Sequence, residues 1–166
     1  MQNLLGPEGP IADDTWVLLG GDSSLEDLPE GDIIVPLALW QSARDQLRSR
    51  PGRTGVLVRS DEQVESLAGE LAGLSLVALD FPVFSDGRSY SNARILRERL
   101  HFQGELRAVG DVLRDQIFLM RRCGFDSFAL RPDRPAGAAA SALHDFRHVY
   151  QQATIDPETP ILARHR

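Results

Sequence analysis

The chain has 166 residues, of which 42% are hydrophobic and 25% are charged, a composition that suits one globular domain with a buried core. All 18 basic residues are arginine, which excludes lysine Schiff-base chemistry and the lysine-bearing phosphate loop of nucleotide hydrolases. The net charge of −6 argues against nonspecific binding to nucleic acid, although a local group of arginines could still hold one small anion.

The chain offers few residues for sulfur or metal chemistry. Its single cysteine, Cys123, cannot form an internal disulfide or hold an iron–sulfur cluster within one chain. Cys123 ends a predicted helix, where the helix dipole disfavours a thiolate, so we expect a buried structural residue. His144 and His148 lie four residues apart, but no third ligand is evident. We therefore expect no metal site and no bound cofactor.

The sequence also bears on location. No run of about 18 apolar residues occurs, so we expect no membrane-spanning segment. The first residues lack the basic start and the apolar core of a signal peptide. Together these features predict a cytoplasmic protein that binds no membrane.

Residues 1–14 are rich in glycine, proline and acidic residues and predict a mobile leader. Apolar runs bounded by turn residues then predict six strands, over 16–20, 32–37, 55–59, 76–80, 105–109 and 127–130. Five helices are expected between and after them, over 38–49, 61–74, 90–100, 111–123 and 137–152. In the fourth helix Asp111 is the expected N-cap and Gly124 the expected C-cap. These elements predict a single α/β domain over 15–152 and a loose tail over 153–166.

The alternation of strand and helix, with crossovers of about 25 residues, is typical of a parallel sheet. In an open doubly wound sheet the strands are apolar on both faces. In a (β/α) barrel, large apolar residues face outward and small or polar ones inward. Here Val77 and Leu79 alternate with Ala78 and Asp80, which slightly favours a partial barrel of parallel β/α units. A full barrel needs about 250 residues, so the partial barrel could also be part of a homodimer.

Three sequence motifs lie close together in the middle of the chain. They read FPxFxDGRxYSxARxLRER from residue 81, GELRAVGDVLRDQ from residue 104, and RCGFD from residue 122. This run resembles the bacterial family called domain of unknown function nine-thirty-four. The resemblance is strong over about 50 residues and extends to about 100 with the preceding strand and helix.

The resemblance implies a role in sulfur assimilation and cysteine biosynthesis, because genes of this family commonly neighbour assimilatory sulfite reductase. It implies no reaction. The family is sometimes labelled an oxidoreductase, but no G-x-G-x-x-G motif supports flavin or nicotinamide binding here. Val83 stands where the family commonly has lysine, and Ser89 where it commonly has glycine. A cation at position 83 therefore cannot be essential in this protein.

The loop over 81–89 follows a predicted strand at the end where parallel α/β proteins build binding sites. Its candidate residues are Asp80, Phe84, Asp86, Gly87, Arg88 and Tyr90. One interpretation is a loop that binds phosphate, sulfite or a carboxylate through the Arg88 guanidinium. The other is a turn made by Asp86 and Gly87, with Arg88 solvated or paired to an aspartate. The aromatic residues keep both open, because nonpolar loop residues often cover a pocket or a partner surface.

Four further candidates lie later in the chain, namely Arg107, Asp111, Arg114 and Arg131. If Arg107 and Arg131 point inward, each needs a carboxylate, which Asp80 or Asp111 could supply, or both face a ligand anion. Asp111 is expected to cap a helix rather than leave its N-terminus open for an anion. Arg114 shares a helix stripe with Arg121 that is either solvated or docks an acidic partner.

The chain supports three functional hypotheses and does not decide whether the protein is an enzyme. The first is an accessory protein of assimilatory sulfite reduction that binds sulfite reductase or its electron supply. The second is a small-molecule enzyme or sensor whose anionic ligand is held by Arg88, Arg107 and Arg131. The third is a purely structural dimer.

Overall fold

The structure is a computed structural model that describes residues 3–146 and 153–154. At its centre is an eight-stranded sheet in the order β2-β1-β8-β7-β6-β5-β4-β3. The strands from β3 to β8 run parallel, and β1 and β2 are added antiparallel beyond β8. Their bounds are Leu4–Gly6 (β1), Gly9–Ile11 (β2), Val17–Leu18 (β3), Ile33–Pro36 (β4), Thr54–Val58 (β5), Leu76–Phe81 (β6), Glu105–Gly110 (β7) and Ser127–Ala129 (β8).

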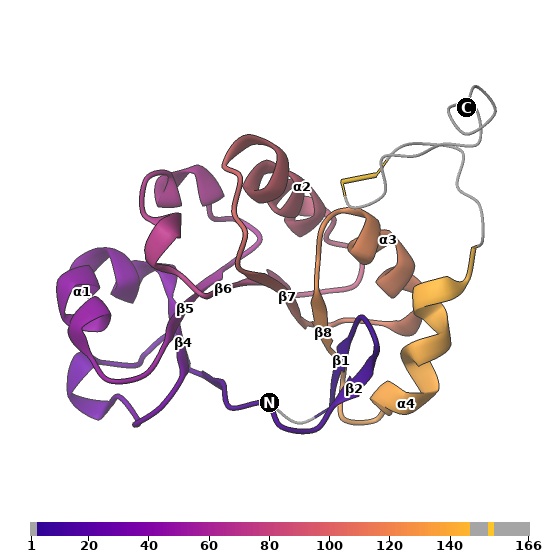
Figure 1. The fold of residues 1–166 in the computed structure, drawn as a ribbon, viewed down its shortest axis with the longest axis horizontal. Helices are drawn as coiled ribbons and strands as arrows, with labels where there is room; N and C mark the ends of the chain where they lie inside the picture. Colours follow the sequence, from indigo (N-terminus) through magenta and orange to yellow (C-terminus); the bar gives the residue numbers. More distant parts are fainter. Residues whose placement is uncertain (1–2, 147–152, 155–166) are drawn as a thin grey trace.

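The sheet curls into half of a barrel, and the helices lie on its convex side (Figure 1). The predicted α/β class and the partial barrel are both confirmed. The helices are α1 (Leu37–Ser49), α2 (Arg88–Arg94), α3 (Ile117–Arg122) and α4 (Ala136–Ala139). Short turns extend or replace helices, namely η1 (Leu25–Asp27), η2 (Val64–Leu67), η3 (Leu71–Gly73), the π-helical η4 (Ile95–Arg99), η5 (Arg114–Gln116) and η6 (Ala140–His144).

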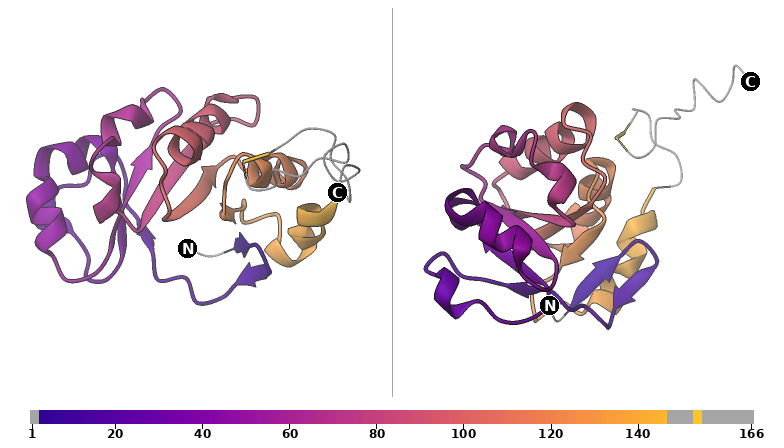
Figure 2. Two further views of the ribbon diagram at one scale, coloured as in Figure 1. Left: turned by 45° about the horizontal axis from the view of Figure 1, so that its top comes forward. Right: turned by 60° about the vertical axis from the view of Figure 1, so that its left-hand side comes forward.

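The alternation along the strands produces two apolar cores. Outward residues such as Val77 and Leu79 pack under the helices in the larger core. Inward residues form a smaller core on the concave face, made of Trp16, Ile34, Leu76, Ala78 and Val109. Figure 2 shows the helices along the outer side of the curved sheet from two further directions. The central strands of the sheet are therefore buried on both faces.

Residues 12–16, which we call the strap, join the two edges of the sheet. They run from β2 at one edge to β3 at the other and cross the open side of the half-barrel (Figure 1). Trp16, at the end of the strap, is buried in the inner core and carries the Arg53 guanidinium over its ring, 4.9 Å from the ring centre. The strap therefore covers part of the concave face.

The N-terminal segment differs from the mobile leader that we expected. From Asn3 onward it forms the hairpin β1–β2, and Leu4 and Leu5 are buried against β8. The Asn3 side-chain amide donates to the carbonyl oxygens of Arg131 (2.7 Å) and Arg134 (2.8 Å), and its oxygen Oδ1 accepts from the Ala136 backbone N–H at 2.7 Å. The ordered domain thus begins before residue 15.

One of the expected helices is also wrong, and another begins later than expected. The segment 61–74 forms the separate turns η2 and η3, because Gly69 between them adopts a positive φ of 83° that interrupts a helix. Asp111 caps no helix, because the next helical turn, η5, begins only at Arg114. The Asp111 carboxylate instead accepts a hydrogen bond from the Phe84 amide and pairs with Arg131. Gly124, at φ 106°, does end α3 as expected.

The C-terminal helix is shorter than predicted. Its described part consists of α4 and η6 and ends at His144, while His148 and residues 147–152 lie outside the described residues. Of the expected tail, only residues 153–154 are described, and the Thr154 amide donates to the Arg122 carbonyl oxygen at 3.0 Å. Across the described residues, each helix is too short or too polar to cross a lipid bilayer.

Candidate functional site

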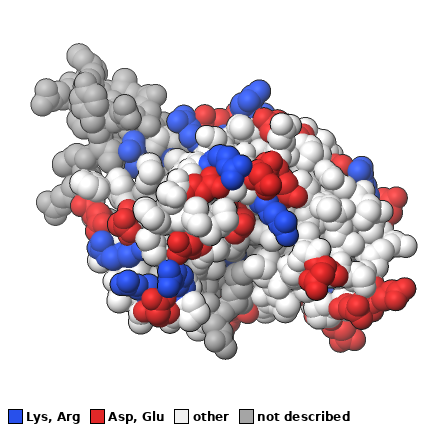
Figure 3. Space-filling model, turned by 180° about the vertical axis from the view of Figure 1, so that it is seen from behind, with Lys and Arg blue, Asp and Glu red and all other residues white. Residues whose placement is uncertain are grey.

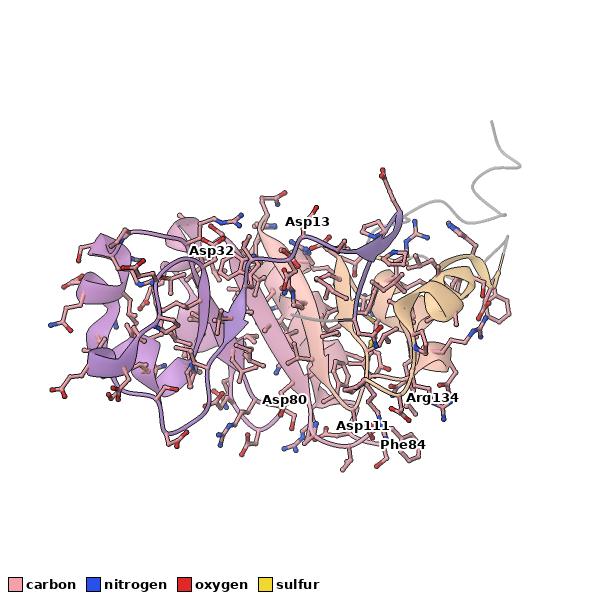
Figure 4. The ribbon with its side chains drawn as sticks, turned by 90° about the horizontal axis from the view of Figure 1, so that it is seen from below. Asp13, Asp32, Asp80, Phe84, Asp111 and Arg134 are labelled. Carbon is pink, nitrogen blue, oxygen red and sulfur yellow. The ribbon has the colours of Figure 1, made fainter. Side chains whose placement is uncertain are left out.

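The carboxyl ends of the parallel strands bring four charged side chains to one edge of the half-barrel. They are Arg59 after β5, Asp80 in β6, Asp111 after β7 and Arg131 after β8, and we call them the rim residues. Figure 4 shows Asp80 and Asp111 at this edge and Asp13 and Asp32 at the opposite one. In parallel α/β folds, this edge is where ligands bind.

Asp80 is half-buried on the concave face, beside Val109 of the next strand. Burial raises the pKa of its carboxyl, an effect that the charge of Arg59 partly opposes and the charges of Asp86 and Asp61 reinforce. Gly110 leaves the space for it: a Cβ there would lie 2.7 Å from the Asp80 Oδ1 and 2.4 Å from the Phe81 carbonyl oxygen. Gly110 also has a φ of 94°, which a side chain would strain.

Arg59 follows the end of β5 and was not among the residues that we selected from the sequence. Its exposed guanidinium lies against the backbone at Gly21, where a Cβ would come within 2.7 Å of Nη2. Leu57, two residues earlier, packs against the inner core, so the alternation of the strand places Arg59 on the same concave face. That alternation was the signal in the sequence that could have identified it.

Asp111 and Arg131 form the second half of the rim. The Arg131 Nη1 lies 3.2 Å from the Asp111 Oδ1, and its Nε donates to Asp133 at 3.1 Å. Of the two interpretations of Arg131, pairing with a carboxylate is the one that these contacts match, and Asp111 is one of its partners. The hydrogen bond to Asp111, followed by the charge of Asp133, raises the pKa of the Arg131 guanidinium.

The loop between β6 and α2, residues 82–87, is attached to the rim through its backbone. The Phe84 amide donates to the Asp111 Oδ2 at 3.1 Å, and the Gln116 side chain donates to the Phe84 carbonyl oxygen at 2.9 Å. The Phe84 side chain itself is 62% exposed, and the neighbouring Val83 is 52% exposed. The structure therefore fixes the backbone of the loop while its two apolar side chains point into solvent.

Asp86 and Arg88 pair with each other at the end of this loop. The Arg88 guanidinium donates to both Asp86 carboxylate oxygens, at 3.0 and 2.7 Å, and to the Ser60 hydroxyl at 2.9 Å. The hydrogen bonds from Arg88, followed by the one from Ser60, hold the pKa of the Asp86 carboxyl well below its usual range. Of the two interpretations of Arg88, the paired arginine is the one that these contacts match.

Tyr90 and Gly87 support the loop rather than face it. The Tyr90 ring is half-buried and packs edge-on against Phe81, with ring centres 5.2 Å apart, and burial raises the pKa of its hydroxyl to about 12. A Cβ at Gly87 would lie in ordinary contact, 3.8 Å from the Tyr90 ring, so the position does not require glycine.

Arg107 lies apart from the rim, inside the half-barrel. It points inward as considered, but its carboxylate partners are Asp14 of the strap and Glu105, not Asp80 or Asp111. Ser127 shares the network, since Arg107 Nε lies 3.2 Å from its hydroxyl oxygen. Arg88, Arg107 and Arg131 therefore do not converge, because each binds its own carboxylates.

Arg114 is directed away from the rim, toward the C-terminal helical segment. Its guanidinium pairs with Asp145 at 2.9 Å and with the Ser141 hydroxyl at 3.1 Å. Arg121, on the same stripe, donates to the Leu143 carbonyl oxygen at 3.0 Å. The stripe therefore holds α3 and η5 against η6.

A scan against protein families matched residues 55–161 to a family described as bacterial protein of unknown function, DUF934. The match spans more than half of the chain. The chain belongs to the DUF934 family. No curated protein matched it.

The DUF934 match begins at β5 and includes the rim residues, the loop 82–87 and Arg107. The strap and Asp14, the main partner of Arg107, lie before it. The description attached to the family states no activity, so any function must be argued from the site. Within the described part of this DUF934 protein, no three acidic, cysteine or histidine side chains are grouped in a way that could hold a metal ion.

Proposed function

We propose that this protein is a cytoplasmic accessory protein of assimilatory sulfite reduction that acts by binding sulfite reductase or the component supplying its electrons. The family resemblance suggests the setting. The observation that supports binding to a protein is the exposed pair Val83 and Phe84, because it is an apolar surface on a loop whose backbone is held in place.

The chemistry of the loop suits protein docking. An exposed phenylalanine gains free energy when a partner buries it, and large aromatic side chains dominate the binding energy of many interfaces. The hydrogen bonds that the Phe84 backbone makes, donating to the Asp111 carboxylate and accepting from the Gln116 side chain, fix the loop before binding, which lowers the entropy lost on association. Two ion pairs next to the loop, Asp86–Arg88 and Asp111–Arg131, would form a polar border around such a contact.

Figure 3 shows the molecule from the side on which these strands end, where acidic and basic side chains lie next to one another. A face of mixed charge supports a specific protein contact rather than attraction to a polyanion. This arrangement is consistent with the net charge of −6 for the chain.

The contacts give less support to the alternative of an anionic ligand held by Arg88, Arg107 and Arg131. Each of these guanidinium groups already binds a carboxylate, so an anion would have to displace an existing ion pair. The structural-dimer alternative assigns no task to the charged residues of the loop. It predicts that replacing Asp86 or Arg88 with alanine leaves growth unaffected.

Growth of a strain lacking the gene tests the proposal. We expect slow growth on sulfate and on sulfite, and normal growth on sulfide, because the block would lie at the reductase. Reintroducing the wild-type gene should restore growth, whereas the Phe84→Ala gene should not. Normal growth of the deletion strain on every sulfur source, or rescue by cysteine alone, would contradict a role at this step.

A further inference from the structure

The rim contains two charged groups of opposite sign on adjacent strands. β5 and β6 are paired through Val58 and Leu79, so the next residues along, Arg59 and Asp80, stand beside each other. Both face the concave side, because Leu57 and Ala78, two residues earlier on each strand, pack in or against the inner core. Neighbouring strands are about 4.8 Å apart, so a single small molecule can reach both side chains.

Arg59 and Asp80 differ from the other charged groups around them. Asp111 binds Arg131, and Asp86 binds Arg88. Among the described residues, neither the Arg59 guanidinium nor the Asp80 carboxylate has an ion pair or a hydrogen bond to another side chain, although Asp80 is half-buried and accepts a hydrogen bond from the Phe81 backbone. A partly buried carboxylate that lacks such a partner is costly to keep, and groups of this kind concentrate at binding sites.

Two glycines shape the backbone around this pair. The Asp80 carboxylate lies where a side chain at Gly110 would stand, and the Arg59 guanidinium lies where a side chain at Gly21 would stand. The backbone therefore approaches both charged groups closely and leaves their remaining hydrogen-bonding positions available. Val109, paired with Asp80 on the next strand, and Ala129 of β8 are apolar residues of the concave side.

The charges of the rim select the kind of ligand. Arg59 and Asp80 carry one charge of each sign, so the pair favours a molecule that carries both signs over a simple anion or cation. A guanidinium binds a carboxylate through two parallel hydrogen bonds, and a carboxylate accepts hydrogen bonds from an ammonium group. In an α-amino acid these two groups are separated by one carbon atom, which matches side chains on adjacent strands.

We propose that the rim binds a free α-amino acid, with the ligand carboxylate on Arg59 and its ammonium group on Asp80. The two residues that would hold the ligand, Arg59 and Asp80, are not among those assigned to the docking contact, and the proposal does not depend on docking. Burial raises the pKa of the Asp80 carboxyl, and a bound ammonium group would compensate for this by stabilising the ionised form.

Thermal melting of the purified full-length chain tests the site. The probes are the common free L-amino acids at millimolar concentration, each beside its deaminated acid and its decarboxylated amine. We expect at least one amino acid to raise the melting temperature by about 2–4 °C, since a ligand that binds only the folded state stabilises it. The matching acid and amine should produce no shift, because each engages only one of the two side chains.

Substitutions test whether the amino acid binds at Arg59 and Asp80. Arg59→Gln and Asp80→Asn should each weaken binding at least about tenfold in calorimetric titration, as expected for a charged partner left unpaired. Gly21→Ala should also weaken it, because its Cβ would push the flexible end of Arg59 aside without disturbing the core. Arg99→Gln is the matched control, since Arg99 is exposed on η4 and should leave binding unchanged.

Three outcomes would overturn the proposal. The first is that no free amino acid shifts the melting temperature. The second is that the shift persists unchanged in Arg59→Gln and Asp80→Asn while both variants still unfold cooperatively. The third is that a deaminated acid binds as tightly as its amino acid, which would remove the role of Asp80. None of these outcomes depends on sulfite reductase, so the site and the docking proposal fail separately.

Discussion

Asp14 of the strap and Arg107 of β7 form a buried ion pair across the inside of the half-barrel. The Arg107 Nη1 and Nη2 donate to the two Asp14 carboxylate oxygens at 3.0 and 2.8 Å, and the side chains are 2% and 3% exposed. The two residues lie 93 positions apart in the chain. The pair therefore ties the N-terminal strap to the centre of the sheet.

Breaking this pair should destabilise the fold strongly. Asp14→Asn leaves the buried Arg107 with Glu105 as its remaining carboxylate partner among those described, so we expect a loss of about 3 kcal/mol in the free energy of unfolding. Urea denaturation measures it. Asp13→Asn is the control, because Asp13 is exposed and should change stability by less than about 0.5 kcal/mol. Equal stability of the two variants would mean that the strap is not held by Asp14.

The same pair should contribute to unfolding in acid. Burial alone would raise the pKa of Asp14, but the hydrogen bonds and charge of Arg107 lower it below its usual value. A carboxyl group whose pKa is lowered in the folded state stabilises the fold above its unfolded pKa, and this stabilisation is lost as the pH falls through the folded pKa. The difference in the free energy of unfolding between the wild type and Asp14→Asn should therefore shrink as the pH falls below about 4. An advantage independent of pH in this range would contradict the ion pair.

Two glycines at the site should respond oppositely to alanine. Gly110→Ala places a Cβ 2.4 Å from the Phe81 carbonyl oxygen in a backbone with φ 94°, so we expect a loss of about 2 kcal/mol or more. Gly87→Ala meets nothing closer than 3.8 Å and should be neutral or slightly stabilising, by up to about 1 kcal/mol. Denaturant unfolding measures the stability of both variants. Similar losses of unfolding free energy for the two would contradict the requirement for glycine at position 110.

Asp80 should reveal a conflict between stability and binding. Because burial raises its pKa, the ionised carboxylate destabilises the fold at neutral pH, and the effect disappears as the pH falls below the unfolded pKa. Asp80→Asn should therefore raise the melting temperature at pH 7 and not at pH 3. If Asp80→Asn is instead less stable than the wild type at pH 7, the ionised Asp80 carboxylate stabilises the fold, which would contradict this prediction.

Cys123 should react slowly with thiol reagents in the native protein. It is buried, and burial raises the pKa of its thiol, an effect that the charges of Arg94 and Arg122 only partly offset. A disulfide reagent such as Ellman's should modify it quickly in urea and at least about tenfold more slowly without urea. Equal rates in the two conditions would contradict its burial.

The partial barrel could be predicted because its cause is local. Val77 and Leu79 alternate with Ala78 and Asp80, and the structure places the first pair in the outer core and the second on the concave face. The same alternation left the direction of Arg107 open, and the structure turns it inward. Its pairing with Asp14 could not be predicted, because Asp14 reaches it only through the path of the strap across the sheet.

The N-terminal hairpin illustrates a second limit. Its residues, with two prolines and two glycines in the first ten, have the composition of a loop. They become strands because β8 offers a free edge and α4 covers Leu4 and Leu5. Arg59 was missed for a different reason, since it ends a predicted strand and belongs to none of the motifs considered.

The most direct test of the docking proposal is the binding of the purified protein to sulfite reductase, and to its electron-supplying partner, from the same bacterium. We expect a complex with one of them, and binding at least about tenfold weaker for Phe84→Ala, a substitution that should leave the melting temperature unchanged. Leu119→Ala is the matched control, because Leu119 is also exposed but lies on α3. Binding to neither partner, or equal binding by wild type and Phe84→Ala, would contradict the account.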